Sequence, residues 1–95
     1  MTNDYVLRLF VAGKTARSER ALADLRQLCE RELGGSYRVE VIDVLEDPSA
    51  AERQKVLATP TVIKELPPPV RRVIGDLSQT EKVLVGLDLV RSEPR

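Results

Sequence analysis

The sequence predicts an α/β domain, with the element order β-α-β-α-β-β-α when its C-terminal segment is helical, and three observations lead to this prediction. Residues 5–11 and 37–44 are apolar and β-prone, and apolar residues recur every three or four positions between them. Two further β-prone segments, 61–63 and 70–74, follow a second helical segment. At 95 residues the chain has the length of one domain, so we expect residues 1–95 to form a single unit.

The first half of the chain is expected to form a βαβ unit. Both alternating sets of side chains in residues 5–11 are mostly apolar, which is typical of a central strand covered on two faces. Residues 18–33 have the spacing of an amphipathic helix, and Gly34 ends it because glycine adopts the left-handed C-cap conformation without steric cost. A crossover helix between two strands makes those strands parallel.

The second half begins with a helix that we expect over residues 48–57. Asp47 has the role of its N-cap, and Pro48 occupies the first helical position, where a missing N–H is no loss. The segments 61–63 and 70–74 are expected to be strands, and the prolines at 67–69 between them exclude a continuous central strand. The spacing Ser78-x-x-Glu81 is that of a capping box, which predicts a last helix starting near residue 79.

The C-terminal segment 82–90 has divided preferences. It follows a helix cap, yet it is rich in valine, and Gly86 costs about 1 kcal/mol in a helix interior. As a strand it would place four apolar side chains on one face, namely Val83, Val85, Leu87 and Leu89. The local preferences of this segment do not decide between helix and strand, so tertiary packing determines which one forms.

Composition argues against most catalytic chemistry. The chain has 15 basic and 15 acidic residues, no histidine, no tryptophan and one cysteine. The even charge argues against a nucleic-acid partner, and no stretch approaches the ~20 apolar residues of a membrane span. Cys29 lies on the apolar side of the predicted helix and is expected to be a structural thiol, because no histidine is present to activate it.

An acidic cluster, Asp43, Glu46 and Asp47, is the nearest approach to a metal site. Helix capping by Asp47 and solvation of the others explain it, so no metal ligand set is expected. No glycine-rich phosphate-binding loop is present either. We therefore expect a cytoplasmic binding protein that is not an enzyme and carries no cofactor.

With a helical C-terminal segment, the element order is similar to that of a thioredoxin-like domain. Thr59-Pro60-Thr61 strengthens the resemblance, because thioredoxin-like proteins have a cis-proline that enters a strand beside their active loop. The resemblance would place a redox Cys-x-x-Cys in the connection formed here by residues 13–18, which contain no sulfur. Thiol–disulfide exchange needs an attacking thiolate, so we predict no redox activity.

Several segments together resemble the KaiB family of circadian clock proteins, and the resemblance covers nearly the whole chain. The segments are Asp43-Val44, Ala58-Thr59-Pro60-Thr61, LPPPVRR at 66–72, IGDLS at 74–78 and EKVLVGLDL at 81–89. The resemblance implies a non-enzymatic regulator that binds the ATPase ring of KaiC, or of a KaiC homologue, and controls its phosphorylation cycle. KaiA and output histidine kinases are further partners that it implies.

The resemblance also implies a metamorphic protein. KaiB-like proteins interconvert between a ground-state homotetramer of order β-α-β-β-α-α-β and a thioredoxin-like monomer of order β-α-β-α-β-β-α that binds KaiC; a dimer is also allowed. The segment ending near Leu89 is a strand in the first form and a helix in the second, which matches its divided preferences. X-Pro bonds isomerise slowly and favour trans by only about 0.5 to 1 kcal/mol, so Pro60, Pro67, Pro68 and Pro69 are expected to take part in the switch.

Five further positions match functional positions of the family. Arg20, Lys55 and Arg72 match its KaiC-facing surface, and we assign them to partner binding. Gly86 and Asp88 match positions that bias the equilibrium between the two folds. The helix propensities give a reason for Gly86: replacement by alanine is expected to favour the helical form by roughly 1 kcal/mol, about fivefold in population.

Two departures from clock members leave the biological setting open. The loop at residues 13–18 differs from theirs, and the chain ends at Arg95 without the acidic tail of many of them. A timer or stress response built on a KaiC-type ATPase is therefore an alternative to a circadian oscillator. A second alternative is a thioredoxin-like adaptor without redox activity, acting in a stress-response or signalling-kinase pathway.

Overall fold

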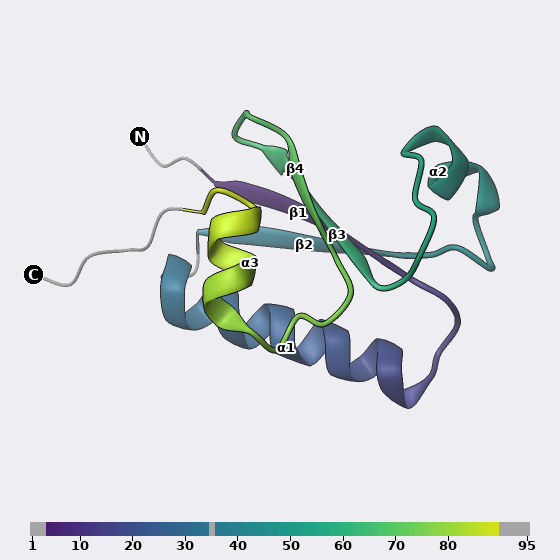
Figure 1. Ribbon diagram of the computed structural model, residues 1–95, viewed down its shortest axis with the longest axis horizontal. Helices are drawn as coiled ribbons and strands as arrows, with labels where there is room; N and C mark the ends of the chain where they lie inside the picture. The colour runs from purple at the N-terminus through teal and green to yellow at the C-terminus, as the bar shows by residue number, and fades with distance from the viewer. Residues whose placement is uncertain (1–3, 35, 90–95) are drawn as a thin grey trace, which may run out of the picture.

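Four strands form one mixed sheet in the computed structural model, which describes residues 4–34 and 36–89 (Figure 1). The strand order is β2-β1-β3-β4. The element order β-α-β-α-β-β-α is the one predicted for the thioredoxin-like form. The elements are β1 (Tyr5–Val11), α1 (Ala16–Leu33), β2 (Tyr37–Asp43), α2 (Pro48–Arg53), β3 (Thr61–Leu66), β4 (Arg71–Ile74) and α3 (Thr80–Gly86).

The βαβ unit forms as predicted. β1 lies between β2, with which it is parallel, and β3, with which it is antiparallel. α1 begins at Ala16, two residues earlier than expected, because the Thr15 hydroxyl caps it by accepting a hydrogen bond from the Ser18 N–H at 3.1 Å. Gly34 ends the helix with a φ of 64°, in the left-handed region that glycine occupies without cost.

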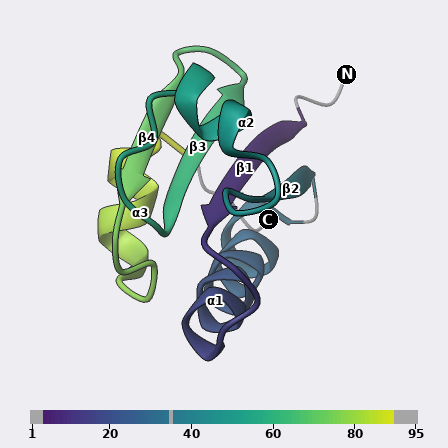
Figure 2. The same cartoon turned by 90° about the vertical axis from the view of Figure 1, so that its right-hand side faces the viewer.

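Helices cover the sheet unequally on its two faces (Figure 2). α1 and α3 pack on one face, over the main core that contains Leu7, Leu9 and Val62. On the other face the short helix α2 covers a small cluster formed by Phe10, Ala50 and Ile63. Val62 and Ile63 belong to different clusters because successive side chains of a strand point to opposite faces.

The helices α2 and α3 end in the same way. α2 stops at Arg53, four residues before the expected end, because Lys55 takes a φ of 56°. The N–H groups of Lys55 and Val56 then bond to carbonyls of the last turn, at 3.1 and 2.9 Å. Asp88 has a φ of 55° after α3 and makes the corresponding arrangement, so both helices end in Schellman motifs without the usual glycine.

Other boundaries also differ from expectation. β3 runs to Leu66, three residues further than predicted, and β4 begins at Arg71, one residue later. The capping box at Ser78 is wrong: α3 has Gln79 as its N-cap, and the Ser78 N–H donates to Asp76 Oδ1 at 2.9 Å instead. Among the described residues, no helix is long and apolar enough to cross a membrane.

Candidate partner-binding site

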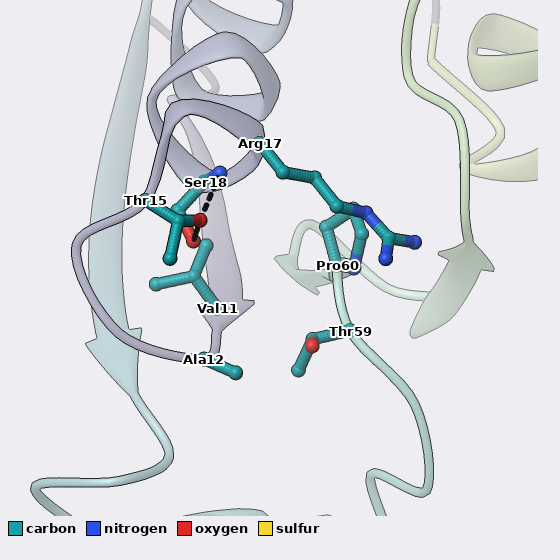
Figure 3. Close-up of a pocket in the computed structure, with 7 residues that line it drawn as sticks. All are labelled: Val11, Ala12, Thr15, Arg17, Ser18, Thr59 and Pro60. Carbon is teal, nitrogen blue, oxygen red and sulfur yellow. Dashed lines mark hydrogen bonds between the residues drawn. The ribbon is translucent and has the colours of Figure 1, made fainter.

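The position of a thioredoxin redox centre is a small hollow between the start of α1 and the start of β3 (Figure 3). It has a volume of about 220 Å³. The hydroxyls of Thr15 and Ser18 are 3.1 Å apart and hydrogen-bonded, and the Arg17 side chain extends towards Pro60. The bond between Thr59 and Pro60 is cis, as the thioredoxin-like resemblance implied.

This hollow has the geometry of a redox site without its chemistry. Thr15 and Ser18 have the spacing of a Cys-x-x-Cys pair, but the Thr15 hydroxyl caps the helix and donates a hydrogen bond to the Ser18 hydroxyl. The chain's one thiol, Cys29, is buried in the main core on α1, where burial raises its pKa to about 12. A thiol with that pKa is protonated at neutral pH and is no nucleophile, so Cys29 is structural.

Arg20 lies beside a second hollow that shares Pro60 with the first. This hollow has a volume of about 260 Å³ and continues along α1 towards the connection between β4 and α3. Arg17, Asp24, Gly75 and Asp76 are among the residues that line it. Arg20 is exposed there, which suits a contact with another protein.

Lys55 and Arg72 lie together on the opposite side of the sheet from α1. The Arg72 guanidinium, on β4, donates to the backbone carbonyls of Gln54 at 2.6 Å and Lys55 at 3.2 Å. The structure thus joins two of the three assigned basic residues through one backbone segment. Arg20 lies on α1 and borders the separate hollow beside Pro60.

The assigned prolines are at the two ends of β3. Pro60 precedes the strand, and Pro67, Pro68 and Pro69 form the connection to β4. The bonds Leu66–Pro67 and Pro68–Pro69 are cis, like that before Pro60.

Gly86 and Asp88 lie at the C-terminal end of α3, which packs against β4. A Cβ added to Gly86 would be 2.5 Å from Val73 Cγ2, closer than side chains approach. Gly86→Ala is expected to raise the population of the helical form, but the new methyl group would clash with Val73 unless that side chain moves. Asp88 occupies the left-handed position of the Schellman motif.

Lys64 has a structural role that the sequence alone did not show. It lies on the same face of β3 as Val62, and with 1% exposure its side chain is buried in the core. Its Nζ donates to the Asp88 carbonyl at 3.3 Å, which ties the end of α3 to the sheet. The alternation of Val62 and Lys64 in a β-prone segment was the available signal, since it places both side chains on one face.

Asp43 is a second residue whose role the sequence did not show. Its Oδ1 accepts the N–H of Gly13 at 2.9 Å and that of Leu45 at 3.0 Å, which fastens the loops after β1 and β2 to each other. These two hydrogen bonds, the Gly13 bond first, hold the pKa of the carboxyl below its usual value. Asp47 caps α2 as predicted, accepting from the Ala50 N–H at 3.2 Å.

Comparison with known proteins gives one consistent family. Residues 8–89 match the KaiB domain. The chain is 54% identical over 88 residues to the circadian clock protein KaiB3 of Synechocystis, covering 93% of this chain and 86% of that one. It is 60% identical over 89 residues to the circadian clock oscillator protein KaiB of Prochlorococcus marinus, covering 94% and 85%.

Solved structures confirm the fold. The N-terminal domain of Synechococcus elongatus SasA has a TM-score of 0.73 at 18% identity, over 87% of this chain and 78% of that one. Mitochondrial thioredoxin 3 of Saccharomyces cerevisiae has a TM-score of 0.68 at 22% identity, over 92% and 79%. At these identities the likeness concerns the fold alone. The fold is thioredoxin-like, and the sequence match over most of its length shows that the chain belongs to the KaiB family.

Proposed function

We propose that the chain is a non-enzymatic regulator that binds the ATPase ring of a KaiC-type protein and controls its phosphorylation cycle. The observation that carries this proposal is 54–60% identity to circadian clock KaiB proteins over more than nine-tenths of the chain. KaiA and output histidine kinases are further partners in this proposal, and the cytoplasm is its place of action.

The thioredoxin-like order supports the docking step. It is the order that the family resemblance associates with the KaiC-binding monomer. In this order the assigned binding residues Arg20, Lys55 and Arg72 are all exposed. The Arg72 guanidinium bonds to the backbone carbonyls of Gln54 and Lys55, which places it beside the end of α2.

The packing of α3 supports a second fold for the same segment. Val83, Leu84 and Leu87 are buried in the helix, whereas Val85 is 78% exposed. A strand over the same residues would place Val85 on the same face as Val83 and Leu87. The exposure of Val85 in the helix is consistent with our proposal that this segment also forms a strand.

Capture of the KaiC-type ATPase from the same organism tests the proposal. The immobilised chain is incubated with the purified ring, with and without ATP, for times from minutes to a day. Retention of the ring is the expected result, and an Arg20→Ala, Lys55→Ala, Arg72→Ala triple variant is expected to lose it. No retention under any of these conditions would contradict the proposal.

A thioredoxin-like adaptor that does not switch is the second candidate, favoured by the likeness to thioredoxins. Such an adaptor is a monomer at every concentration. The leading proposal expects a tetramer that slowly releases monomer. Size-exclusion chromatography over a hundredfold range of concentration separates the two candidates.

A further inference from the structure

The strand β2 forms one edge of the sheet, and no strand lies beyond it in the described ranges 4–34 and 36–89 (Figure 2). Sheet edges carry unpaired N–H and C=O groups that can pair with another strand, and proteins usually protect them with proline, lysine, a bulge or a short strand. β2 has seven residues, contains neither proline nor lysine, and pairs with β1 without a register shift. This edge is therefore open to pairing.

The free backbone groups of β2 belong to alternate residues. The N–H of Val44, directly after β2, donates to the Val11 carbonyl on β1 at 2.8 Å, so even-numbered positions direct their backbone groups towards β1. Successive residues of a strand direct these groups to opposite sides. The backbone groups of Tyr37, Val39 and Val41 thus point away from the sheet.

Charge selects how a second copy of β2 would pair with the first. An antiparallel pair of identical strands has a two-fold axis, and with this axis at Val39, Arg38 of each copy lies opposite Glu40 of the other. An axis at Glu40 would place two carboxylates directly opposite each other, which is destabilising. An axis at Val41 would place Glu40 opposite the apolar Ile42. Only the axis at Val39 gives opposite charges in both copies.

Arg8 on β1 holds Glu40 in position for this pairing. The Arg8 Nε lies 3.1 Å from Glu40 Oε1, and Arg38 Nη2 lies 3.1 Å from Glu40 Oε2. In the paired strands Arg38 would exchange the Glu40 of its own chain for that of the second copy. Exposed ion pairs add little net stability, so these charges set the register, and apolar contacts must supply the affinity.

Apolar contacts are available on the face of β2 that α1 covers. The register places Tyr37 of one copy opposite Val41 of the other, and Val41 is 45% exposed in a single copy. The Tyr37 ring is tied to α1, because its hydroxyl donates to Glu30 Oε2 at 2.6 Å. Val41 also borders a hollow of about 410 Å³ between the first half of α1 and the end of β2. The hollow is lined by apolar and charged side chains, among them Val11, Leu22, Lys14, Glu19 and Asp43.

The other edge of the sheet does not offer the same match. β4 has only four residues, and the prolines at 67–69 precede it. Short strands and nearby prolines are the usual protection of an edge. Self-pairing is therefore expected at β2 and not at β4.

We propose that the thioredoxin-like form self-associates through β2, as a two-fold dimer whose strands pair antiparallel about Val39. The dimer joins two four-stranded sheets into one continuous sheet and keeps the C-terminal segment helical. It thus differs from the tetramer that the family resemblance implies. The KaiC-type ring has no part in this inference, which goes beyond the proposed function.

Disulfide trapping tests the register. Each variant carries Cys29→Ala, so the introduced cysteine is its one thiol. Val39→Cys places two thiols across the axis, where a Cα separation of about 5.5 Å suits a disulfide. Val41→Cys, on the same face, is the matched control, because its two copies would be about 14 Å apart along the strands. With oxidised glutathione, Val39→Cys is expected to give at least tenfold more covalent dimer. Equal trapping of both, or no trapping of Val39→Cys, would overturn the register.

Charge reversal tests the pairing without a change of cysteines. Arg38→Glu and Glu40→Arg each place like charges opposite one another, so each is expected to raise the dimer Kd by at least about tenfold in sedimentation velocity. Arg71→Glu, the same change on the other edge strand, is expected to stay within about twofold. A mixture of the Arg38→Glu and Glu40→Arg chains restores opposite charges at both positions, so heterodimers should form at least as tightly as the unaltered dimer.

The outcomes separate this inference from the proposed function. A mixture that shows no recovery, or an unaltered chain that forms no dimer, would overturn the self-pairing and leave ring binding untouched. A chain that dimerises as described but does not retain the KaiC-type ring would contradict the proposed function alone.

Discussion

The buried side chain of Lys64 shows how one residue ties the last helix to the sheet. Its Nζ lies beneath α3 and donates to the Asp88 carbonyl at 3.3 Å. Burying a polar group is costly unless it is hydrogen-bonded, and the Asp88 carbonyl supplies that partner. Lys64 thus links β3 to the segment whose secondary structure we propose to change.

Substitution of Lys64 is expected to loosen the end of α3. Lys64→Ala removes the buried stem and the hydrogen bond, which should destabilise this fold by about 2–4 kcal/mol. Lys64→Met keeps most of the volume and should cost less than half as much. Hydrogen exchange at the Leu87 and Leu89 amides measures the effect, with Lys82→Ala, an exposed change on α3, as the control. Equal exchange in all variants would contradict the role given to Lys64.

Asp43 makes the stability of the folded chain depend on pH in the acidic range. Hydrogen bonds from Gly13 and Leu45 lower its pKa in the folded chain. A lowered pKa means that its contribution to stability is complete above the unfolded-state pKa of about 3.9 and is lost as the pH falls through the folded-state value. Asp76 has a lowered pKa for a similar reason, through its hydrogen bonds with Ser78.

Unfolding free energies measured between about pH 5 and pH 2 test this role of Asp43. Stability of the unaltered chain should fall across this interval. Asp43→Asn keeps an oxygen acceptor but no charge, so its stability should fall less steeply. An Asp43→Asn slope equal to that of the unaltered chain would show that the Asp43 charge has no such effect.

At the scale of elements, α3 is held in place by close packing on β4. Gly86 leaves no room for a Cβ beside Val73, where the separation would be 2.5 Å. Helix propensity therefore favours alanine at 86 while local packing opposes it. These two effects are separable, because Val73 is the neighbour that causes the clash.

A double-mutant cycle separates them. In a Val73→Ala background, Gly86→Ala is expected to raise the monomer-to-tetramer ratio by about fivefold, the full propensity gain of roughly 1 kcal/mol. In the unaltered background the gain should be smaller, because Val73 must move. Sedimentation velocity at fixed total concentration measures both ratios. Equal gains in the two backgrounds would rule out the clash.

Much of the fold could be predicted from periodicity and capping residues. The parallel pairing of β1 and β2 and the helix end at Gly34 follow from local patterns. The early end of α2 could not be predicted, because the positive φ of Lys55 depends on tertiary contacts of Val56 and Arg72. The capping box failed because Asp76 competes for the Ser78 N–H.

The family resemblance could select residues of the candidate site, but it could not predict how the fold arranges them. The family resemblance selected Lys55 and Arg72, but their separation in sequence gives no sign that Arg72 bonds to the Lys55 carbonyl. Leu57 falls at the end of the helix expected over residues 48–57, where the sequence gives no sign of its exposure. Only the observed end of α2 at Arg53 shows that it is exposed.

At the scale of the whole molecule, the chain combines a thioredoxin-like fold with a C-terminal segment that suits two structures. A native state is only a few kcal/mol more stable than competing states. A chain with a small core can therefore have two folds of similar free energy. Our central claim is that only the thioredoxin-like monomer binds the partner ring. On this claim, we expect binding to wait for a slow conformational change in the free chain.

The rate of association at increasing ring concentration tests this claim most directly. If binding selects a minor form, the observed rate levels off at the rate of the conformational change once the ring is in excess. We expect such a plateau, and we expect the Gly86→Ala, Val73→Ala double variant to enlarge the fast phase that precedes it. A rate that rises in proportion to ring concentration, with no plateau and no fast phase, would contradict the claim.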